Sequence, residues 1–388
     1  MLKQLDAEAD AKAIFSLSQF AFQYTLSEEV LQFELQKARD HMIWGWMTGD
    51  ELAAKLHLIP LTCYINGQPF AMGGVSAVAT WPEYRRQGMV KQLLEHALHY
   101  MHRHGWTVSF LHPFSFAFYR KYGWEHVFSE KKYHIRITTL QRPRNIHGYV
   151  RRIGDELDVL QAIYTKYAKG FNGTLDRDTK WWQQRVLADH LHKAVAYYPD
   201  GTADGYMLYY VKNNIMYVHE IVCQSIHAQQ LMLQFIADHD SMADTVEMTV
   251  PEYDHLPLLL DEPRIEQTIH PYFMARIVDV PSFLKHYPFR DAGQIHFLLH
   301  IDDAFLPVNN GTYHVLQMGS ETTVTCLPDS GQNQPAIHCR VGYLASMLFG
   351  YKRPGELYRA DLVQGEKEAI DQLESIIPDR EPYFPDFF

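Results

Sequence analysis

Residues 75–91 read Val75-Ser-Ala-Val-Ala-Thr-Trp-Pro-Glu-Tyr-Arg-Arg-Gln-Gly-Met-Val-Lys91. Their apolar start predicts a strand that ends at Thr80, and Pro82 turns the chain away from that strand. After Gly88 the apolar spacing becomes i, i+3, i+4, i+7, i+8 and i+11, which is typical of an amphipathic helix that stops at Gly105. The residues of this apolar stripe are Val90, Leu93, Leu94, Ala97, Leu98 and Met101. A strand, a polar turn and a helix therefore decide how the first part of the chain folds.

The turn between strand and helix, Arg85-Arg86-Gln87-Gly88, has the composition of an anion site. The first backbone N–H groups of a helix have no partner within it, and the helix dipole makes that end positive. Gly88 lets a ligand approach the backbone, and two arginines suit a diphosphate. On these residues alone, an ordinary turn with exposed arginines is an open alternative. The absence of G-x-x-x-x-G-K-[ST], G-x-G-x-x-G and G-x-S-x-G disfavours nucleoside triphosphates, dinucleotides and a serine hydrolase.

The surrounding segments predict a first unit of mixed α and β structure. Residues 51–64 and 70–80 form two strands, and Asn66-Gly67 between them is a strong hairpin signal. Residues 15–36 have helical spacing. A short strand over residues 106–111 and a short helix over residues 115–122 follow the long helix.

A second and a third unit follow a polar, turn-forming stretch at residues 141–145. The second unit repeats the order hairpin, helix, strand, which indicates a duplicated fold whose second copy lost the loop chemistry. Its predicted helices are 155–167, 179–187 and 228–238, and its strands are 194–198, 206–212, 215–223 and 245–250. After Pro281 we expect strands at 296–301 and 322–327 and helices at 342–349 and 366–376. The expected domains are therefore residues 1–143, 144–284 and 285–388.

Length and composition favour a soluble enzyme of several domains. The 388 residues exceed the size of a single comfortable core, and 47% apolar with 21% charged residues is ordinary globular usage. The acidic N-terminus does not resemble a signal peptide, and no apolar run is long enough to span a bilayer. We expect a cytoplasmic protein without a membrane partner. The scattered cysteines predict buried, reduced thiols, and they are Cys63, Cys223, Cys326 and Cys339.

The charge balance points away from nucleic acid and towards a cationic partner. The net charge is -11, and residues 286–388 contribute -7 of it, with 7 Lys and Arg against 14 Asp and Glu. A solvated acidic face is the plainer explanation for any one of these charges. His96, His99 and His102 recur along the long helix, but their spacing drifts around it, so we expect no metal site.

The strand, Pro82, residues 85–88 and the following helix resemble the acetyl-CoA loop of the GNAT superfamily of N-acetyltransferases, whose pattern is Gln/Arg-x-x-Gly-x-Gly/Ala. Val90 departs from the last position of that pattern. This departure and the chain length resemble the enhanced intracellular survival branch, in which two acetyltransferase-like domains precede a sterol-carrier-protein-like domain. The resemblance implies an α/β (α+β) fold with a degenerate second GNAT-like domain, and it suggests a homohexamer.

Carried over residue by residue, the resemblance implies an acetyl-CoA site and two catalytic groups. Tyr119 matches the proton donor of the family, and the C-terminal carboxylate of Phe388 matches its base. A neutral phenol can protonate the departing CoA thiolate, and burial can raise a carboxyl pKa towards a useful range. Without the resemblance, Tyr119 reads as a core aromatic and the tail as a docked segment. The implied cofactor contacts are Val78, Ala79 and Thr80 for the pantetheine arm, Arg85, Arg86, Gln87, Gly88, Met89, Val90 and Lys91 for the diphosphate, and Phe114 and Ser115 beside them.

The function expected from these residues is transfer of an acetyl group from acetyl-CoA to a primary amine, by direct attack in a ternary complex. The acidic C-terminal region favours a polycationic acceptor such as an aminoglycoside or a polyamine. One alternative is a lipid-binding carrier protein that keeps a relic of the acetyltransferase loop. The other alternative keeps the enzyme but makes a protein lysine its substrate.

Overall fold

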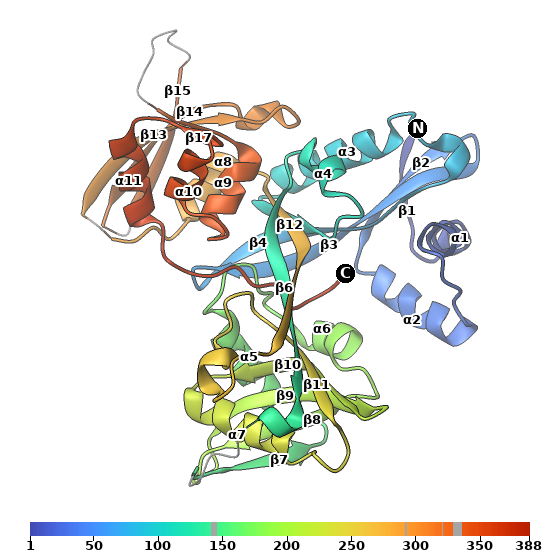
Figure 1. Cartoon of the computed structure of the whole chain (residues 1–388). Helices are drawn as coiled ribbons and strands as arrows, with labels where there is room; N and C mark the ends of the chain where they lie inside the picture. The colour runs from blue at the N-terminus through green and yellow to red at the C-terminus, as the bar shows by residue number, and fades with distance from the viewer. Residues whose placement is uncertain (141–145, 292, 320, 329–335) are drawn as a thin grey trace.

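The computed structural model describes residues 1–140, 146–291, 293–319, 321–328 and 336–388, arranged as three units. Figure 1 shows the first unit at the upper right, the second below it and the third at the upper left. The stretch expected as the first domain boundary, residues 141–145, lies outside the described residues. No helix in the described part of the chain combines the length and apolar character needed to cross a bilayer.

The first unit contains the predicted hairpin and the long helix. The hairpin strands are β3 (Glu51–Ile65) and β4 (Gln68–Thr80), and the helix is α3 (Met89–Arg103). Six side chains of α3 are buried. They include every residue of the predicted apolar stripe except Val90, which is half-buried. The remaining elements are β1 (Leu2–Leu5), α1 (Ala11–Phe22), α2 (Glu28–Ala38), β2 (Met42–Thr48), a 3₁₀ turn (Pro82–Tyr84), β5 (Val108–Leu111), α4 (Phe116–Arg120) and β6 (Glu125–Arg136).

The single helix expected over residues 15–36 is wrong, because the structure has α1 and α2 there. Gln23 ends α1 in the left-handed conformation, with φ +56°. Ser27 then starts α2, since its side chain accepts a hydrogen bond from the backbone N–H of Val30 at 3.3 Å. A serine followed by two glutamates is an ordinary helix start, and the apolar periodicity on both sides concealed it.

The second unit has the predicted order of hairpin, helix and strand. Its helix over residues 179–187 is in fact a single α-turn, α6 (Thr179–Trp181), continued by a π-helix (Trp182–Val186). The other elements are β7 (Tyr149–Ile153), α5 (Leu157–Ala168), β8 (His192–Tyr197), β9 (Ala203–Lys212), β10 (Ile215–Cys223), α7 (Ile226–Ala237), β11 (Thr245–Val250), a 3₁₀ turn (Leu256–Leu259) and β12 (Glu266–Ile277).

One sheet runs through the first two units. Its strand order is β1-β2-β3-β4-β5-β12-β6-β11-β10-β9-β8-β7. Strand β12 leaves the second unit and lies between two strands of the first, pairing antiparallel with β5 from Met274↔Leu111 to Ile277↔Val108. Its other edge pairs with β6. The two units therefore share their central strands.

The third unit is a separate five-stranded sheet with helices packed against it. Its strand order is β15-β14-β13-β16-β17. After α11 the chain returns to the middle of the molecule, where Figure 1 marks the C-terminus. The elements are α8 (Val280–His286), β13 (Gln294–Asp302), a 3₁₀ turn (Pro307–Asn309), β14 (Gly311–Met318), β15 (Glu321–Leu327), β16 (Ile337–Arg340), α9 (Val341–Leu348), α10 (Pro354–Arg359), β17 (Val363–Gln364) and α11 (Lys367–Ile376).

The largest apolar core joins all three units. It extends from Ile59 on β3 through the second unit to Ile376 on α11 and ends with Phe388. The cysteines are unpaired thiols, of which Cys63 and Cys339 are buried and Cys223 is half-buried. The expectation of burial is wrong for Cys326, which is exposed because the outer strand β15 carries it at the edge of the sheet.

Candidate active site

Strand β4 contains a β-bulge at the residues predicted to hold the pantetheine arm. Its pairing with β3 shifts between Lys55↔Ala79 and His57↔Ser76, so β4 has one residue more than β3 over this interval. Ala77 takes up the extra residue in a left-handed conformation, with φ +49°. Bulges of this kind bend a strand and increase its twist.

The bulge follows the point at which β4 and β5 separate. These strands pair in parallel from Met72↔Val108 to Gly74↔Phe110, and their ladder ends there. Beyond Gly74, the edge of β4 that faces β5 has no strand partner among the described residues. Val78, Ala79 and Thr80 lie on this open edge, so their backbone groups can pair with an extended ligand.

The turn that follows β4 leaves a helix N-terminus and three cations open to solvent. Arg86 and Gly88 adopt positive φ angles of +63° and +81°, and no side chain caps α3. Arg85, Arg86 and Lys91 are exposed, and none of them forms an ion pair within the described ranges. A β-carbon at Gly88 would meet no atom within 4 Å. Gln87 is exposed and bonds the carbonyl of Glu83 at 3.1 Å, and the first helical residues, Met89 and Val90, turn their side chains towards the core.

Helix α4 places Tyr119 next to the residues predicted beside the cofactor. Ser115 caps the helix, since its side chain accepts a hydrogen bond from the N–H of Phe118 at 3.3 Å. The Tyr119 side chain is buried, with its ring 5.6 Å from that of the exposed Phe114. Burial raises the pKa of the Tyr119 phenol above its usual value, so the hydroxyl stays protonated at neutral pH.

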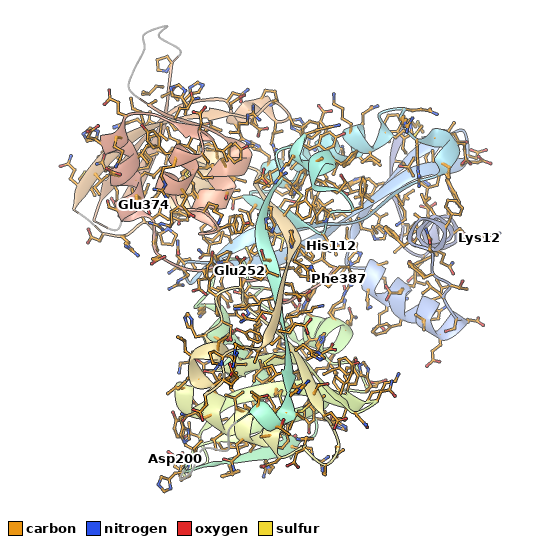
Figure 2. The ribbon with its side chains drawn as sticks, viewed as in Figure 1. Lys12, His112, Asp200, Glu252, Glu374 and Phe387 are labelled. Atoms are coloured by element: carbon orange, nitrogen blue, oxygen red, sulfur yellow. The ribbon has the colours of Figure 1, made fainter. Side chains whose placement is uncertain are left out.

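The last residue of the chain lies where β4 and β5 begin to separate. The Phe388 ring covers Gly74, where a β-carbon would be only 2.9 Å from it. The ring of Phe387 lies 5.2 Å from that of His112, the first residue after β5, and Figure 2 shows the two side by side. Phe388 itself is buried, against Phe273 at 5.2 Å between ring centroids. Residues far apart in sequence are thus brought to the same end of β4 and β5.

A row of buried polar side chains, Lys55, His57 and His41, lies next to the bulge and was not predicted from the sequence. The Lys55 amine lies 3.0 Å from His57 Nε2 and donates to the carbonyl of Ala77 at 3.3 Å. His57 Nδ1 is in turn 3.2 Å from His41 Nδ1. Desolvation lowers the pKa of Lys55 to about 7 and that of His41 to about 3. The only sequence signal is that Lys55 and His57 alternate with apolar residues in a strand otherwise suited to burial.

This row of polar side chains supports the unusual backbone of the bulge. The extra residue of a bulge loses its ladder partner, and the Lys55 amine supplies one to the carbonyl of Ala77. The His residues extend the contact towards solvent at His41, which is half-buried. The described residues contain no group of three or more His, Cys, Asp and Glu side chains that could hold a metal ion.

A cavity of about 650 Å³ lies near the terminal residue, although Phe388 is not among the residues that line it. It lies between the end of α2, the outer part of β3 and the start of the second unit. Leu61 and Trp181 line it. Leu61 and the Phe388 ring both face Gly74, and the Trp181 ring lies 6.3 Å from that of Phe388. Its charged side chains are balanced rather than acidic, and they are Lys37, Asp40, Asp176, Asp178, Lys180 and Arg185. The acidic surplus of residues 286–388 does not line this cavity.

Family models match all three units. Residues 4–127 match an acetyltransferase (GNAT) domain, and residues 173–277 match a second model of the same description. Residues 280–385 match a sterol carrier protein domain. An uncharacterized N-acetyltransferase of Streptomyces griseus is 23% identical over 253 residues, which are 57% of this chain and 60% of that relative. The chain therefore spans less than two thirds of the relative's length.

Solved structures share the fold over the whole chain. A probable N-acyltransferase of Enterococcus faecalis superposes with a TM-score of 0.93 at 24% identity, covering 100% of this chain and 99% of the other. Eis1 of Mycobacterium abscessus gives 0.83 at 21% identity, with both chains covered completely. The predicted architecture of tandem acetyltransferase units and a sterol-carrier-like unit is confirmed. The chain belongs to the GNAT N-acetyltransferase superfamily, with two acetyltransferase domains followed by a sterol carrier protein domain.

Proposed function

We propose that this protein transfers an acetyl group from acetyl-CoA to a primary amine. The observation that carries the proposal is the continuity between the open edge of β4 and the uncapped start of α3. Pantetheine has amide groups that can pair with a strand edge, and a diphosphate needs donors and positive charge. The first acetyltransferase domain offers both along one continuous stretch, residues 78–91.

The residues present fit this donor. Backbone groups of Val78, Ala79 and Thr80 would pair with the pantetheine arm. The N–H groups at the start of α3, from Met89 to Lys91, would bind the diphosphate together with the side chains of Arg85 and Arg86. Phe114 and Ser115 would border the arm on the side of α4. The open space in front of Gly88 supports close approach of the phosphates.

The acid and the base are proposed to be Tyr119 and the terminal carboxylate of Phe388. As the C–N bond forms and the C–S bond breaks, the carboxylate takes a proton from the amine and the phenol gives one to the departing sulfur. Burial supports both roles, because it keeps the Tyr119 phenol protonated and places Phe388 away from bulk water. A shortened chain that ends at Phe387 should bind acetyl-CoA normally and lose turnover. Undiminished turnover would remove Phe388 from the mechanism.

We propose a small cationic amine, such as an aminoglycoside or polyamine, as the acceptor. The net charge of -11 supports this class, although the charges that line the cavity near Phe388 are balanced. A panel of amines assayed by release of free CoA thiol tests it. Acetylation of a partner protein, with no small amine accepted, would favour the protein-lysine alternative. The homohexamer suggested by resemblance stays a prediction.

The lipid-carrier alternative has less support. In the third domain, Phe297, Leu299, Leu344 and Ile370 pack into the same core as the acetyltransferase domains. This domain therefore contributes to the interior that surrounds the tail. Calorimetry with acetyl-CoA discriminates the two functions. The absence of binding, with uptake of a fluorescent fatty acid, would support the carrier.

A further inference from the structure

The C-terminal tail, residues 377–388 after α11, is fixed to one short segment of the second domain, residues 172–177. Asn172 pairs with the tail through its backbone, because its N–H donates to the carbonyl of Glu381 and its carbonyl accepts from the N–H of Tyr383, both at 2.9 Å. Its side-chain amide donates to the carbonyls of Arg380 at 3.2 Å and Phe349 at 3.0 Å. One buried asparagine thus fixes the start of the tail.

The same segment also pairs with the first domain. Tyr64 of β3 donates its N–H to the carbonyl of Thr174 at 2.8 Å and accepts from the N–H of Gly173 at 2.7 Å. The side chain of Asn172 accepts a hydrogen bond from the N–H of Asn66 at 2.7 Å. Residues 172–176 are therefore tied to the strand hairpin that contains β4.

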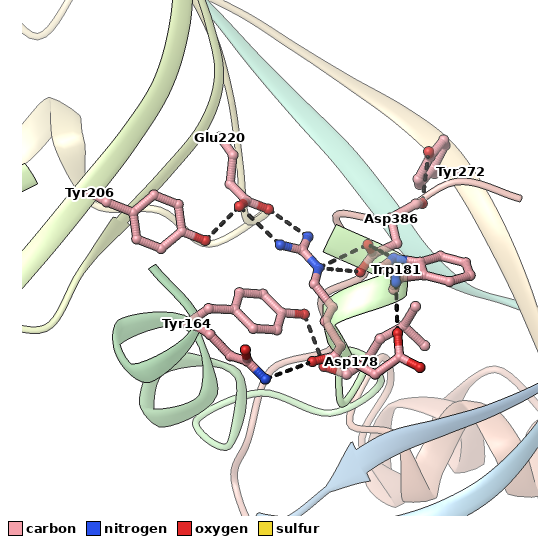
Figure 3. A network of polar contacts seen from close by, with 10 residues as sticks. Tyr164, Asp178, Trp181, Tyr206, Glu220, Tyr272 and Asp386 are labelled. Atoms are coloured by element: carbon pink, nitrogen blue, oxygen red, sulfur yellow. Dashed lines mark hydrogen bonds and ion pairs between the residues drawn. The ribbon is translucent and has the colours of Figure 1, made fainter. Parts of the chain in front are cut away.

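Arg177 ends the segment at the centre of a buried ionic network, drawn in Figure 3. Its Nη1 and Nη2 donate to the two carboxylate oxygens of Glu220 at 3.0 and 2.6 Å. This bidentate contact directs Nε towards Asp386, whose Oδ1 accepts at 2.9 Å. Asp386 Oδ1 also accepts from Trp181 Nε1 at 2.7 Å, and its carbonyl accepts from the hydroxyl of Tyr272 at 3.0 Å.

The network immobilises the chain two residues before its end. Asp386 is held through both its side chain and its backbone, so only two residues separate a fixed point from the terminal carboxylate. Two residues span at most about 7 Å. The arrangement contains one cation and two carboxylates, and desolvation raises the pKa of Asp386 although Arg177 opposes this effect. A tail that merely covered the core would need only apolar contacts. Burying an ion pair costs desolvation free energy, so such a tail would not require the contact between Arg177 and Asp386.

We infer that Arg177 and Asp386 are positioning residues, through which the second, degenerate acetyltransferase domain sets the place of the Phe388 carboxylate. The inference rests on the proposed function, because it assumes that this carboxylate is the base. It gives the second domain a role in the chemistry of the first. Misplacement of a reacting group by about 1 Å can cost roughly 100-fold in rate, so loss of the anchor should act on turnover.

Asp386→Ala tests the anchor without leaving an unpaired charge, because Arg177 keeps Glu220. We expect kcat to fall about 100-fold while the KM for acetyl-CoA stays within about two-fold. Asp386→Asn retains an oxygen acceptor for Arg177 and Trp181, and it should restore kcat to within about ten-fold of the unmodified protein. Glu220→Gln leaves the contact between Arg177 and Asp386 in place and should lower kcat less than Asp386→Ala.

A second measurement reads the tail without reference to activity. A carboxypeptidase should release Phe388 from Asp386→Ala at least several-fold faster than from the unmodified protein, at equal thermal stability. Tyr272→Phe, which removes one hydrogen bond to the Asp386 carbonyl, is the gentle variant for use if Asp386→Ala does not fold. It should release Phe388 faster and lower kcat by a few-fold.

Equal effects of Asp386→Ala, Asp386→Asn and Glu220→Gln on kcat, with unchanged release of Phe388, would overturn the positioning role. The chain lacking Phe388 separates the two proposals. If that chain loses turnover and Asp386→Ala does not, the proposal that Phe388 is the base is supported and the proposal that Asp386 positions it is contradicted. If that chain keeps turnover, Phe388 is not the base. Faster release of Phe388 from Asp386→Ala would then still show that Asp386 anchors the tail, but without a role in catalysis.

Discussion

The two acetyltransferase domains differ at the turn between their hairpin and their helix. In the first domain, eight residues separate β4 from α3, and the helix starts without a side-chain cap. In the second, only Gln224 and Ser225 separate β10 from α7, and Ser225 Oγ accepts from the N–H of Ala228 at 3.1 Å. Ser225 also donates to Asp204. The same helix end that is free for an anion in the first domain is thus satisfied internally in the second.

The strand before that turn is bulged in both domains, with different consequences. The bulge on β4 turns the carbonyl of Ala77 to the buried amine of Lys55 and precedes the open strand edge. The pairing of β10 with β9 shifts between Val218 and Glu220, and Glu220 then binds Arg177. Each domain thus has a bulge on this strand, which precedes the proposed ligand site in the first and carries a partner of Arg177 in the second.

The largest expected effect is confined to the first domain. Tyr119→Phe removes only the proposed acid, and we expect kcat to fall by about 100-fold or more with little change in acetyl-CoA affinity. Tyr210→Phe removes a phenol hydroxyl from the second domain, where Tyr210 stacks on Tyr217, and should leave kcat unchanged. Steady-state assays of thiol release measure both. Equal losses from the two variants would contradict a division of labour between the domains.

The two domains also offer a matched pair of arginine doublets. Replacing Arg85 and Arg86 together with Ala should weaken acetyl-CoA binding by about 10- to 100-fold, because two charge-assisted contacts to the diphosphate are lost. Replacing the exposed Arg151 and Arg152 of the second domain changes the net charge equally and should leave binding within two-fold. Calorimetric titration gives both constants. Similar losses would mean that overall charge, and not the turn, attracts the cofactor.

The two bulges should respond differently to pH. Desolvation lowers the pKa of Lys55 to about 7, from 10.5 when unfolded, so the unfolded chain binds more protons between these values. The free energy of unfolding should therefore rise with pH across this window, by up to about 1.4 kcal/mol per pH unit, and Lys55→Met should lack this slope. Glu220 and Arg177 should stay charged throughout the window. Desolvation opposes the charge on each, but Arg177 lowers the pKa of Glu220, and the carboxylates of Asp386 and Glu220 raise the pKa of Arg177. Denaturant titrations at pH 7 to 9 check the difference, and parallel curves for the two proteins would show that Lys55 is charged in the fold.

The smallest expected effect concerns the capped turn. Ser225→Ala removes the cap of α7 and should lower the free energy of unfolding by about 1 kcal/mol. Acetyl-CoA affinity should not change, because this helix end does not face the ligand. Thermal unfolding and calorimetry measure the two quantities. A gain of a second acetyl-CoA site in this variant would show that the cap alone closes the second domain to the ligand.

Local signals in the sequence were sufficient for the hairpin and for the turn that precedes α3. Asn66 and Gly67 connect β3 to β4 as predicted, and the apolar stripe from Leu93 to Met101 is buried. Long-range pairings were not accessible in this way. Nothing in the periodicity of residues 266–277 shows that they pair with β5, more than 150 residues earlier in the chain.

The same limit applies to the candidate site. The turn at Arg85 to Gly88 could be proposed as an anion site because the residues that would form it are neighbours in sequence. The burial of Lys55 depends on which strands cover it, and the proposed role of Arg177 depends on a carboxylate 209 residues away. Tyr119 and Phe388 were identified by resemblance and stay proposals. The expected domain limits at residues 143 and 284 also stay predictions.

The insertion of β12 has a consequence for how the protein is made. A ribosome that has completed β6 has produced every strand of the first unit, but β12 of the second unit, which fills the gap between β5 and β6, has not yet been made. The sheet can close only after roughly 130 further residues have been synthesised, and until then β5 presents an unpaired apolar edge that favours aggregation. Formation of the proposed acetyl-CoA site should therefore lag behind translation of its own residues, and the isolated first domain should be a poor substitute for the whole chain.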